Sequence, residues 1–130
     1  MYNGQEAEGK RIYERKGKEV DVLCAKYDMD GNTLTIALSG EIDHHTAKSV
    51  RLEIDRQIYY YRAKTVLLDL KNVGFMDSSG LGLILGRYTH VKEAGGVLKI
   101  LDPCAGAERV LKLAGTEKII PIVKSRDLGK

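Results

Sequence analysis

The stretch of sequence that decides the fold is Val73-Gly74-Phe75-Met76-Asp77-Ser78-Ser79-Gly80-Leu81-Gly82-Leu83-Ile84-Leu85-Gly86-Arg87-Tyr88. It comes after an apolar segment at 65–70 that predicts a buried strand, with a short connection at 71–74. The Asp-Ser-Ser-Gly turn then opens a run of apolar residues and glycines that favours a packed helix over 78–92. We expect Ser78 or Ser79 to cap this helix with its hydroxyl, at a positive helix end where a phosphate would bind well.

The predicted helix contains three glycines, Gly80, Gly82 and Gly86. Each of them costs roughly 1 kcal/mol relative to alanine in a helix interior, and less near the first turn. A helix that keeps all three glycines must need positions without side-chain atoms. Either it packs very closely on the sheet or something else approaches its backbone, and the sequence leaves both explanations open.

The composition is that of one ordinary globular domain. The chain has 130 residues, of which 43% are hydrophobic and 30% charged. No apolar run approaches the ~20 residues that a membrane span needs, and the first residues lack the apolar core of a signal peptide. Cys24 and Cys104 lie outside any C-x-x-C pair and are expected to be buried thiols. We therefore expect a cytoplasmic protein without membrane contact.

The charge is unevenly distributed along the chain. Residues 1–18 hold five Lys/Arg against three Glu, whereas the remainder holds 16 Lys/Arg against 15 Asp/Glu. A nearly neutral domain gives little support for direct nucleic-acid binding. The first residues are also polar without a sustained apolar period. We therefore predict a flexible N-terminal extension at 1–18 and a single domain at 19–130.

A β-hairpin is predicted at the start of this domain. Apolar residues alternate over 20–29, the turn Asp30-Gly31-Asn32 follows, and the segment 33–38 repeats apolar residues with a period of two. Asp43 or Thr46 can then cap a helix whose apolar positions are three and four residues apart. These positions are Ala47, Val50, Ile54 and Ile58.

Strands and helices alternate through the rest of the chain. After the helix over 78–92, which Ala94-Gly95-Gly96 ends, the pattern predicts a strand at 97–101 and a third helix that starts at Asp102-Pro103 and that Gly115 closes. A last strand at 119–123 lies at an edge, because Pro121 cannot donate to a ladder. The order predicts an α/β fold, in which an N-terminal β-hairpin is followed by alternating helices and strands. The sheet is mostly parallel and packed with helices.

No complete catalytic, nucleotide-binding or metal-binding motif is present in the sequence. Neither Ser78 nor Ser79 has the G-x-S-x-G spacing of a hydrolase elbow, and the glycines carry no P-loop lysine. The segment 80–86 also departs from the G-x-G-x-x-G pattern of dinucleotide sites. Adjacent His44 and His45 point in different directions, which favours a loop surface over a metal site. We therefore expect no enzyme activity, no cofactor and no metal.

Two motifs together resemble a known family. The first is Gly40-Glu41-Ile42-Asp43-His44-His45-Thr46-Ala47, and the second is the run from Phe75 to Tyr88 quoted above. Their aspartates, Asp43 and Asp77, are 34 positions apart. In order and spacing, residues 20–124 resemble the bacterial anti-sigma factor antagonists of the STAS domain family.

The resemblance implies a partner-switching protein. In this family the serine directly after the motif aspartate, here Ser78, is phosphorylated by the anti-sigma factor, which is itself a serine kinase. The unphosphorylated antagonist binds the ADP-bound form of that kinase and frees a sigma factor, which the first motif suggests is a sporulation sigma factor. A PPM-type serine phosphatase later restores the serine. The residues expected at the partner contact of this monomer are Glu41, Asp43, His44, His45, Thr46, Asp77, Ser79, Gly80 and Leu81.

Three alternatives stay open at the level of sequence, and the weakest is an enzyme, which hydrolysis assays of Ser78→Ala would test. Ser78 can be a helix cap in a domain with an unrelated binding role. The chain can also be a non-switching STAS scaffold or a ligand-sensing module in a stress-signalling complex. A lack of phosphorylation by any cognate kinase would favour the scaffold or the sensor.

Overall fold

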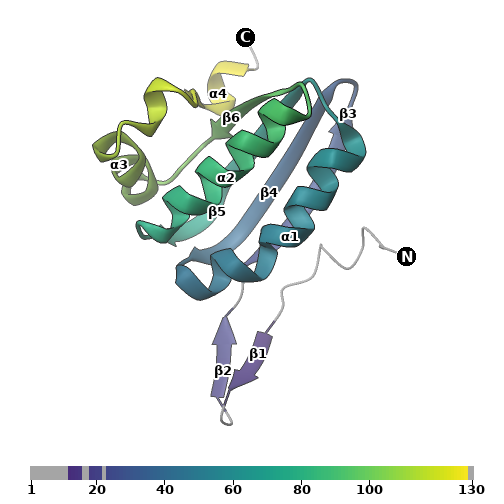
Figure 1. The fold of residues 1–130 in the computed structure, drawn as a ribbon. Helices are drawn as coiled ribbons and strands as arrows, with labels where there is room; N and C mark the ends of the chain where they lie inside the picture. Colours follow the sequence, from purple (N-terminus) through teal and green to yellow (C-terminus); the bar gives the residue numbers. More distant parts are fainter. Residues whose placement is uncertain (1–11, 16–17, 22, 129–130) are drawn as a thin grey trace.

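The computed structural model describes residues 12–15, 18–21 and 23–128. Two short strands, β1 (Ile12–Arg15) and β2 (Lys18–Asp21), pair antiparallel in a sheet of their own (Figure 1). Most of the extension predicted at 1–18 lies outside the described residues, so its flexibility stays a prediction.

Five strands form the main sheet, in the order β3-β4-β5-β6-β7. β3 and β4 are antiparallel, and the other neighbouring pairs are parallel. The bounds are β3 (Cys24–Asp30), β4 (Thr33–Ile42), β5 (Thr65–Met76), β6 (Val97–Leu101) and β7 (Ile122–Val123). The predicted hairpin and the mostly parallel α/β sheet are both confirmed. The first strand of the hairpin begins at Cys24 and not at residue 20, because Lys18–Asp21 pairs with β1 in the smaller sheet.

The α-helices of the described chain are α1 (His44–Tyr61), α2 (Ser79–Glu93), α3 (Ala105–Leu113) and α4 (Ser125–Leu128). α1 contacts β3 and β4, and α2 contacts β5 and β6, so the two helices lie side by side on one face of the sheet (Figure 1). No helix in the described part of the chain has the length and apolar character needed to cross a membrane.

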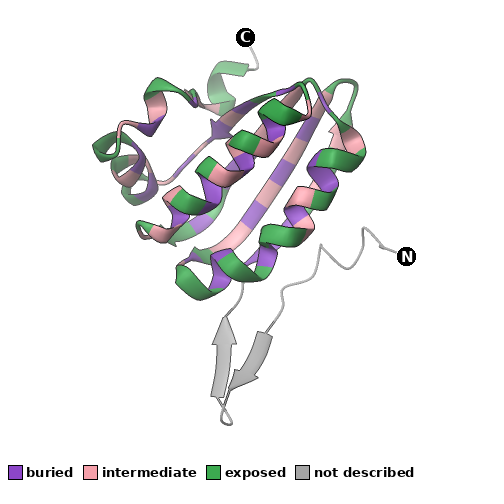
Figure 2. Cartoon of the chain, viewed as in Figure 1, coloured by how far each residue is buried: buried purple, intermediate pink, exposed green. Residues whose placement is uncertain are grey.

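The core lies between these two helices and the sheet. Leu34, Ile36 and Leu38 alternate along β4 with at most 1% of each residue exposed, as the period of two predicts (Figure 2). The predicted apolar positions of α1 are buried opposite them. Each fully buried Leu or Ile side chain contributes about 1.5–3 kcal/mol. The two sequence periodicities therefore produce the faces that pack together.

β5 is much longer than the predicted strand at 65–70, and the connection expected at 71–74 is wrong. The strand continues to Met76 through two register shifts against β4, each of which leaves an extra residue on β5. Lys71, Asn72 and Gly74 are exposed in this part. The register shifts break the regular alternation of buried and exposed residues in this part of β5. Its sequence therefore has the polar pattern that is typical of a connection between elements.

The third helix starts later than predicted. It begins at Ala105 rather than at Asp102-Pro103. Asp102 has a positive φ of 51°, and its Oδ1 accepts a hydrogen bond of 2.9 Å from the Ser125 N–H. Gly115, with φ 74°, follows the helix end as predicted, since glycine adopts this conformation without strain.

The C-terminal strand and one cysteine also differ from the predictions. The strand expected at 119–123 is reduced to β7, because Thr116–Lys118 forms a 3₁₀ helix and Ile120 turns into the core. β7 is an edge strand, as Pro121 predicts. Cys24 is buried, whereas Cys104 is only partly buried.

The three glycines of α2 have different surroundings. A Cβ on Gly80 would collide with the side chain of Met76, whose Sδ would lie 2.6 Å away, and would press on Ile42. At Gly82 and Gly86, no described atom lies within 4 Å of an added Cβ outside the helix's own backbone. Close packing on the sheet therefore explains Gly80 and leaves the other two unexplained.

This difference predicts opposite effects of alanine at two neighbouring glycines. Gly82→Ala should raise the free energy of unfolding by up to ~1 kcal/mol, because it removes a helix penalty without a clash. Gly80→Ala should lower it by about 1–3 kcal/mol, because Met76 has to move in a packed core. Urea unfolding followed by circular dichroism measures both. Equal effects of the two substitutions would contradict the packing described here.

Candidate functional site

The two sequence motifs meet at one edge of the main sheet. Ile42 is the last residue of β4 and pairs with Met76, the last residue of β5. The Asp77 N–H also donates a hydrogen bond of 3.1 Å to the Ile42 carbonyl. Neighbouring strands lie about 5 Å apart, so the turn at Asp43 and the turn at 77–78 are side by side. Both α1 and α2 begin there.

Asp43 caps α1 through a reciprocal set of hydrogen bonds. Its Oδ1 accepts from the His45 N–H at 2.9 Å and from the Thr46 N–H at 3.0 Å. Thr46 Oγ1 in turn accepts from the Asp43 N–H at 2.9 Å and donates to the Glu41 carbonyl at 2.7 Å. This is a capping box, with Asp43 as the cap and Thr46 as its partner. The hydrogen bond from the Thr46 N–H lowers the pKa of Asp43 below its usual value.

α2 is capped by an aspartate and not by a serine. Asp77 Oδ1 accepts a hydrogen bond of 2.8 Å from the Ser79 N–H. Ser78 occupies the N-cap position with φ −63° and ψ −18°, and its side chain makes no capping hydrogen bond in the described structure. The predicted hydroxyl cap is therefore wrong. Ser78 already has a helical backbone, whereas a serine that caps a helix usually has an extended one.

As a result, the Ser78 side chain is exposed and plays no part in holding the helix. Glu41, His44 and His45 are also exposed, and the His44 and His45 rings meet edge to face with centroids 5.7 Å apart. Asp43, Asp77, Ser79 and Leu81 are partly buried. Among the residues predicted at the partner contact, these exposed and partly buried ones form the accessible surface around Ser78.

Two predicted contact residues, Thr46 and Gly80, are buried. Thr46 belongs to the capping box, and Gly80 lets α2 approach Met76. Their place in the structure is to hold the two turns together. Sequence reasoning missed Phe75, which is 49% exposed and pairs in register with Glu41. Its position could have indicated it in the sequence, because an aromatic residue there comes directly before the buried last residue of a strand.

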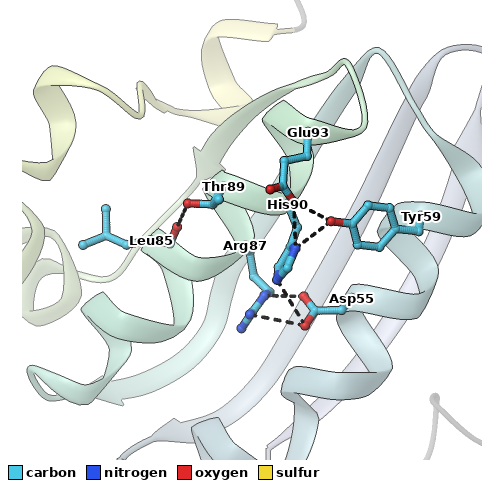
Figure 3. A network of polar contacts seen from close by, with 7 residues as sticks. All are labelled: Asp55, Tyr59, Leu85, Arg87, Thr89, His90 and Glu93. Carbon is cyan, nitrogen blue, oxygen red and sulfur yellow. Dashed lines mark hydrogen bonds and ion pairs between the residues drawn. The ribbon is translucent and has the colours of Figure 1, made fainter.

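A polar network joins the middle and the C-terminal halves of α1 and α2 (Figure 3). The Arg87 side chain is buried, and its Nε lies 2.7 Å from Asp55 Oδ1. The Tyr59 hydroxyl donates to Glu93 Oε1 at 2.7 Å and lies 2.7 Å from His90 Nδ1. His90 Nε2 lies 3.6 Å from Asp55 Oδ2, which connects the two parts. The network fixes how the two helices lie against each other.

The described residues offer no group of three or more His, Cys, Asp or Glu side chains that could hold a metal ion. The adjacent histidines are in the first turn of α1 and not on the loop that was expected, because Asp43 caps the helix directly before them. His90 lies in the network with Asp55. At the candidate site, the chain instead provides two capped helix N-termini and an exposed hydroxyl. This arrangement suits recognition of another protein and modification of that hydroxyl.

Comparisons with known proteins agree with this geometry. A profile of the STAS domain matches residues 25–128. An anti-sigma F factor antagonist of Paenibacillus polymyxa is 45% identical over 89 residues, which are 68% of this chain and 76% of that protein. The chain therefore belongs to the STAS domain family, as the two motifs predicted.

Solved structures of SpoIIAA have the same fold. The anti-sigma factor antagonist SpoIIAA in its unphosphorylated form matches with a TM-score of 0.67 at 27% identity, over 81% of this chain and 92% of that chain. The phosphorylated form of the Bacillus cell fate determinant SpoIIAA matches with a TM-score of 0.61 at 27% identity, over 81% and 96%. The fold of this chain thus resembles both forms.

The capping box predicts a pH-dependent stability. A carboxylate with a lowered pKa stabilises the fold above its unfolded pKa of about 3.9, and this stabilisation is lost as the pH falls through the folded pKa. Asp43→Asn keeps a good cap without the charge. The difference in unfolding free energy between the wild type and Asp43→Asn should be constant above about pH 5. Below about pH 4 the wild type should lose stability relative to Asp43→Asn. Urea titrations at pH 3–7 measure it, and a difference independent of pH would contradict the capping role of the charge.

The ion pair between α1 and α2 predicts a second stability effect. Arg87→Met leaves Asp55 without its partner and should cost about 2–3 kcal/mol, less than the 3–5 of a fully buried pair because the Asp55 side chain is 18% exposed. The double variant Asp55→Leu and Arg87→Met should recover part of this loss, because no unpaired charge remains. Chemical unfolding of both variants measures the coupling, and additive losses would contradict it.

Proposed function

We propose that this chain is an anti-sigma factor antagonist controlled at Ser78. Its unphosphorylated form binds the ADP-bound anti-sigma factor serine kinase and releases a sporulation sigma factor. Phosphorylation of Ser78 by that kinase ends the binding, and a PPM-type serine phosphatase restores it. The protein acts as a cytoplasmic monomer, without enzyme activity and without direct contact to nucleic acid.

The observation that carries the proposal is the state of Ser78. The residue is exposed at the N-terminus of α2, and the capping role that would occupy its hydroxyl belongs to Asp77. A kinase can reach this hydroxyl without disturbing the helix cap. The names of the relatives and the solved forms of SpoIIAA support the same interpretation.

An electrostatic switch is sufficient for the proposed control. A phosphoserine adds about −1.5 to −2 charges at neutral pH. At ~6 Å and an effective dielectric constant of ~20, the repulsion is roughly 3 kcal/mol for each pair of unit charges, before salt screening. An exposed helix N-terminus offsets only ~0.3–1 kcal/mol. Since ~1.4 kcal/mol changes an affinity tenfold, a phosphate beside Asp43 and Asp77 can reverse partner choice without refolding.

The test is phosphorylation by the cognate anti-sigma factor kinase with ATP, followed by intact-mass spectrometry and site mapping. We expect one phosphate on Ser78, none on Ser78→Ala, and one on Ser79→Ala. In binding assays Ser78→Ala should bind the kinase permanently. Ser78→Asp should bind at least tenfold more weakly, although one carboxylate imitates a dianion imperfectly.

The control is a kinase shown to be active on another substrate. If such a kinase adds no phosphate to this chain, the switching mechanism is wrong and a non-switching scaffold or ligand-sensing module becomes the better explanation. If the phosphate appears on Ser79, the choice between the two adjacent serines is wrong.

A further inference from the structure

A groove lies between the N-terminal halves of α1 and α2, directly beside Ser78. Its volume is about 470 Å³. The lining residues are His44, Ala47, Lys48, Arg51, Ser79, Gly82 and Leu83. α1 thus forms one wall and α2 the other, and Ser79 connects the groove to the proposed phosphorylation site.

The groove has a positive wall without a matching negative one. His44, Lys48 and Arg51 lie three and four residues apart on α1, so they follow one another along the same face. No acidic residue lines the groove, and Lys48 and Arg51 have no ion pair among the described residues. Asp43 and Asp77, at the starts of the two helices, accept hydrogen bonds from helix N–H groups.

The other charges along the α1–α2 seam, the line where the two helices meet, also leave the groove without a negative partner for its cations. One turn after Arg51, Asp55 pairs with Arg87 and is not available to the groove. Burial lowers the pKa of Arg87, Asp55 raises it, and the charge of nearby Arg51 lowers it. Arg51 is thus near a second cation on α2. At the groove end of the seam, Lys48 and Arg51 form no ion pair among the described residues.

Gly82 is a second and independent feature of the groove. It is exposed, and no described atom lies within 4 Å of an added Cβ outside the helix's own backbone. Internal packing gives no reason for glycine there, in contrast to Gly80. A glycine that costs roughly 1 kcal/mol in a helix keeps one wall of the groove free of side-chain atoms.

We propose that this groove receives an acidic segment of the anti-sigma factor, with carboxylates on Lys48 and Arg51 and the segment's backbone close to Gly82. The inference rests on the proposed function and adds the chemistry of the contact. It also gives the phosphate a second effect. A phosphate on Ser78, next to groove residue Ser79, would bring negative charge to the end of the groove and repel the carboxylates of the partner.

The test measures the affinity of the full, unphosphorylated chain for the ADP-loaded cognate kinase by titration calorimetry. Lys48→Glu and Arg51→Glu should each weaken binding by about tenfold at low salt, and their salt dependence should be smaller than that of the wild type. Circular dichroism checks that these exposed substitutions leave the fold intact.

Lys26→Glu is the matched control for charge. The Tyr27 hydroxyl donates to Glu53 on α1 at 2.9 Å, so the exposed neighbour Lys26 points to the other face of the sheet. This variant makes the same change in net charge and should bind within about twofold of the wild type.

A second pair of variants tests the shape of the groove. Gly82→Leu should fill it and weaken binding by about tenfold or more without loss of stability. Gly106→Leu on α3 is the matched control, because Gly106 is exposed and also has no described atom within 4 Å of an added Cβ outside the helix's own backbone. It should bind like the wild type.

The outcomes separate this inference from the proposed function. If the wild type binds and the groove variants bind equally well, the groove is not the contact and the proposed function stands. If Lys26→Glu weakens binding as much as Arg51→Glu, the effect is one of net charge and the inference is overturned. If the wild type does not bind an active ADP-loaded kinase, the proposed function fails and this inference fails with it.

Discussion

The parallel pairing of β4 with β5 is the constraint on which the rest of the structure depends. It sets Ile42 opposite Met76, so two motifs that are far apart in the sequence follow neighbouring strand ends. The hydrogen bond from the Asp77 N–H to the Ile42 carbonyl continues the pairing into the turns. Both helices then begin at one edge of the sheet. Their positive N-termini are adjacent because the strands before them are.

Two adjacent helix N-termini need acceptors for their free N–H groups. Asp43 and Asp77 provide these acceptors, so the carboxylates are held by the fold before any partner arrives. Ser78 follows one of them and is left exposed. A negative charge added to its hydroxyl would therefore meet fixed carboxylates and a fixed helix end. A surface of this kind can respond to one phosphate without moving its backbone.

The seam between α1 and α2 divides into two parts with different chemistry. Further from the site, ion pairs and hydrogen bonds among Asp55, Arg87, Tyr59, His90 and Glu93 connect the two helices (Figure 3). Near the site, Lys48 and Arg51 form no ion pair among the described residues, and Gly82 adds no side chain to the groove between the helices. The contacts of the first part connect the two helices that form the walls of the second part. A groove whose walls are already held in place suits specific binding, because less ordering is needed when a partner binds.

The sequence by itself determined the order of the elements from β3 to β7, the hairpin, the buried faces of β4 and α1, and a helix cap at Asp43 or Thr46. These features depend on residues within a few positions of one another. The local periodicity of apolar residues and the types of the capping residues therefore predict them. Only the tertiary structure decided three other features. β5 extends to Met76 because its irregular half pairs with β4, which no local pattern reveals. Ser78 is free because Asp77 takes the cap, a choice set by backbone angles at the strand end. The groove exists because α1 and α2 pack side by side, and the distance between two helices depends on long-range packing that spacing along the chain does not encode.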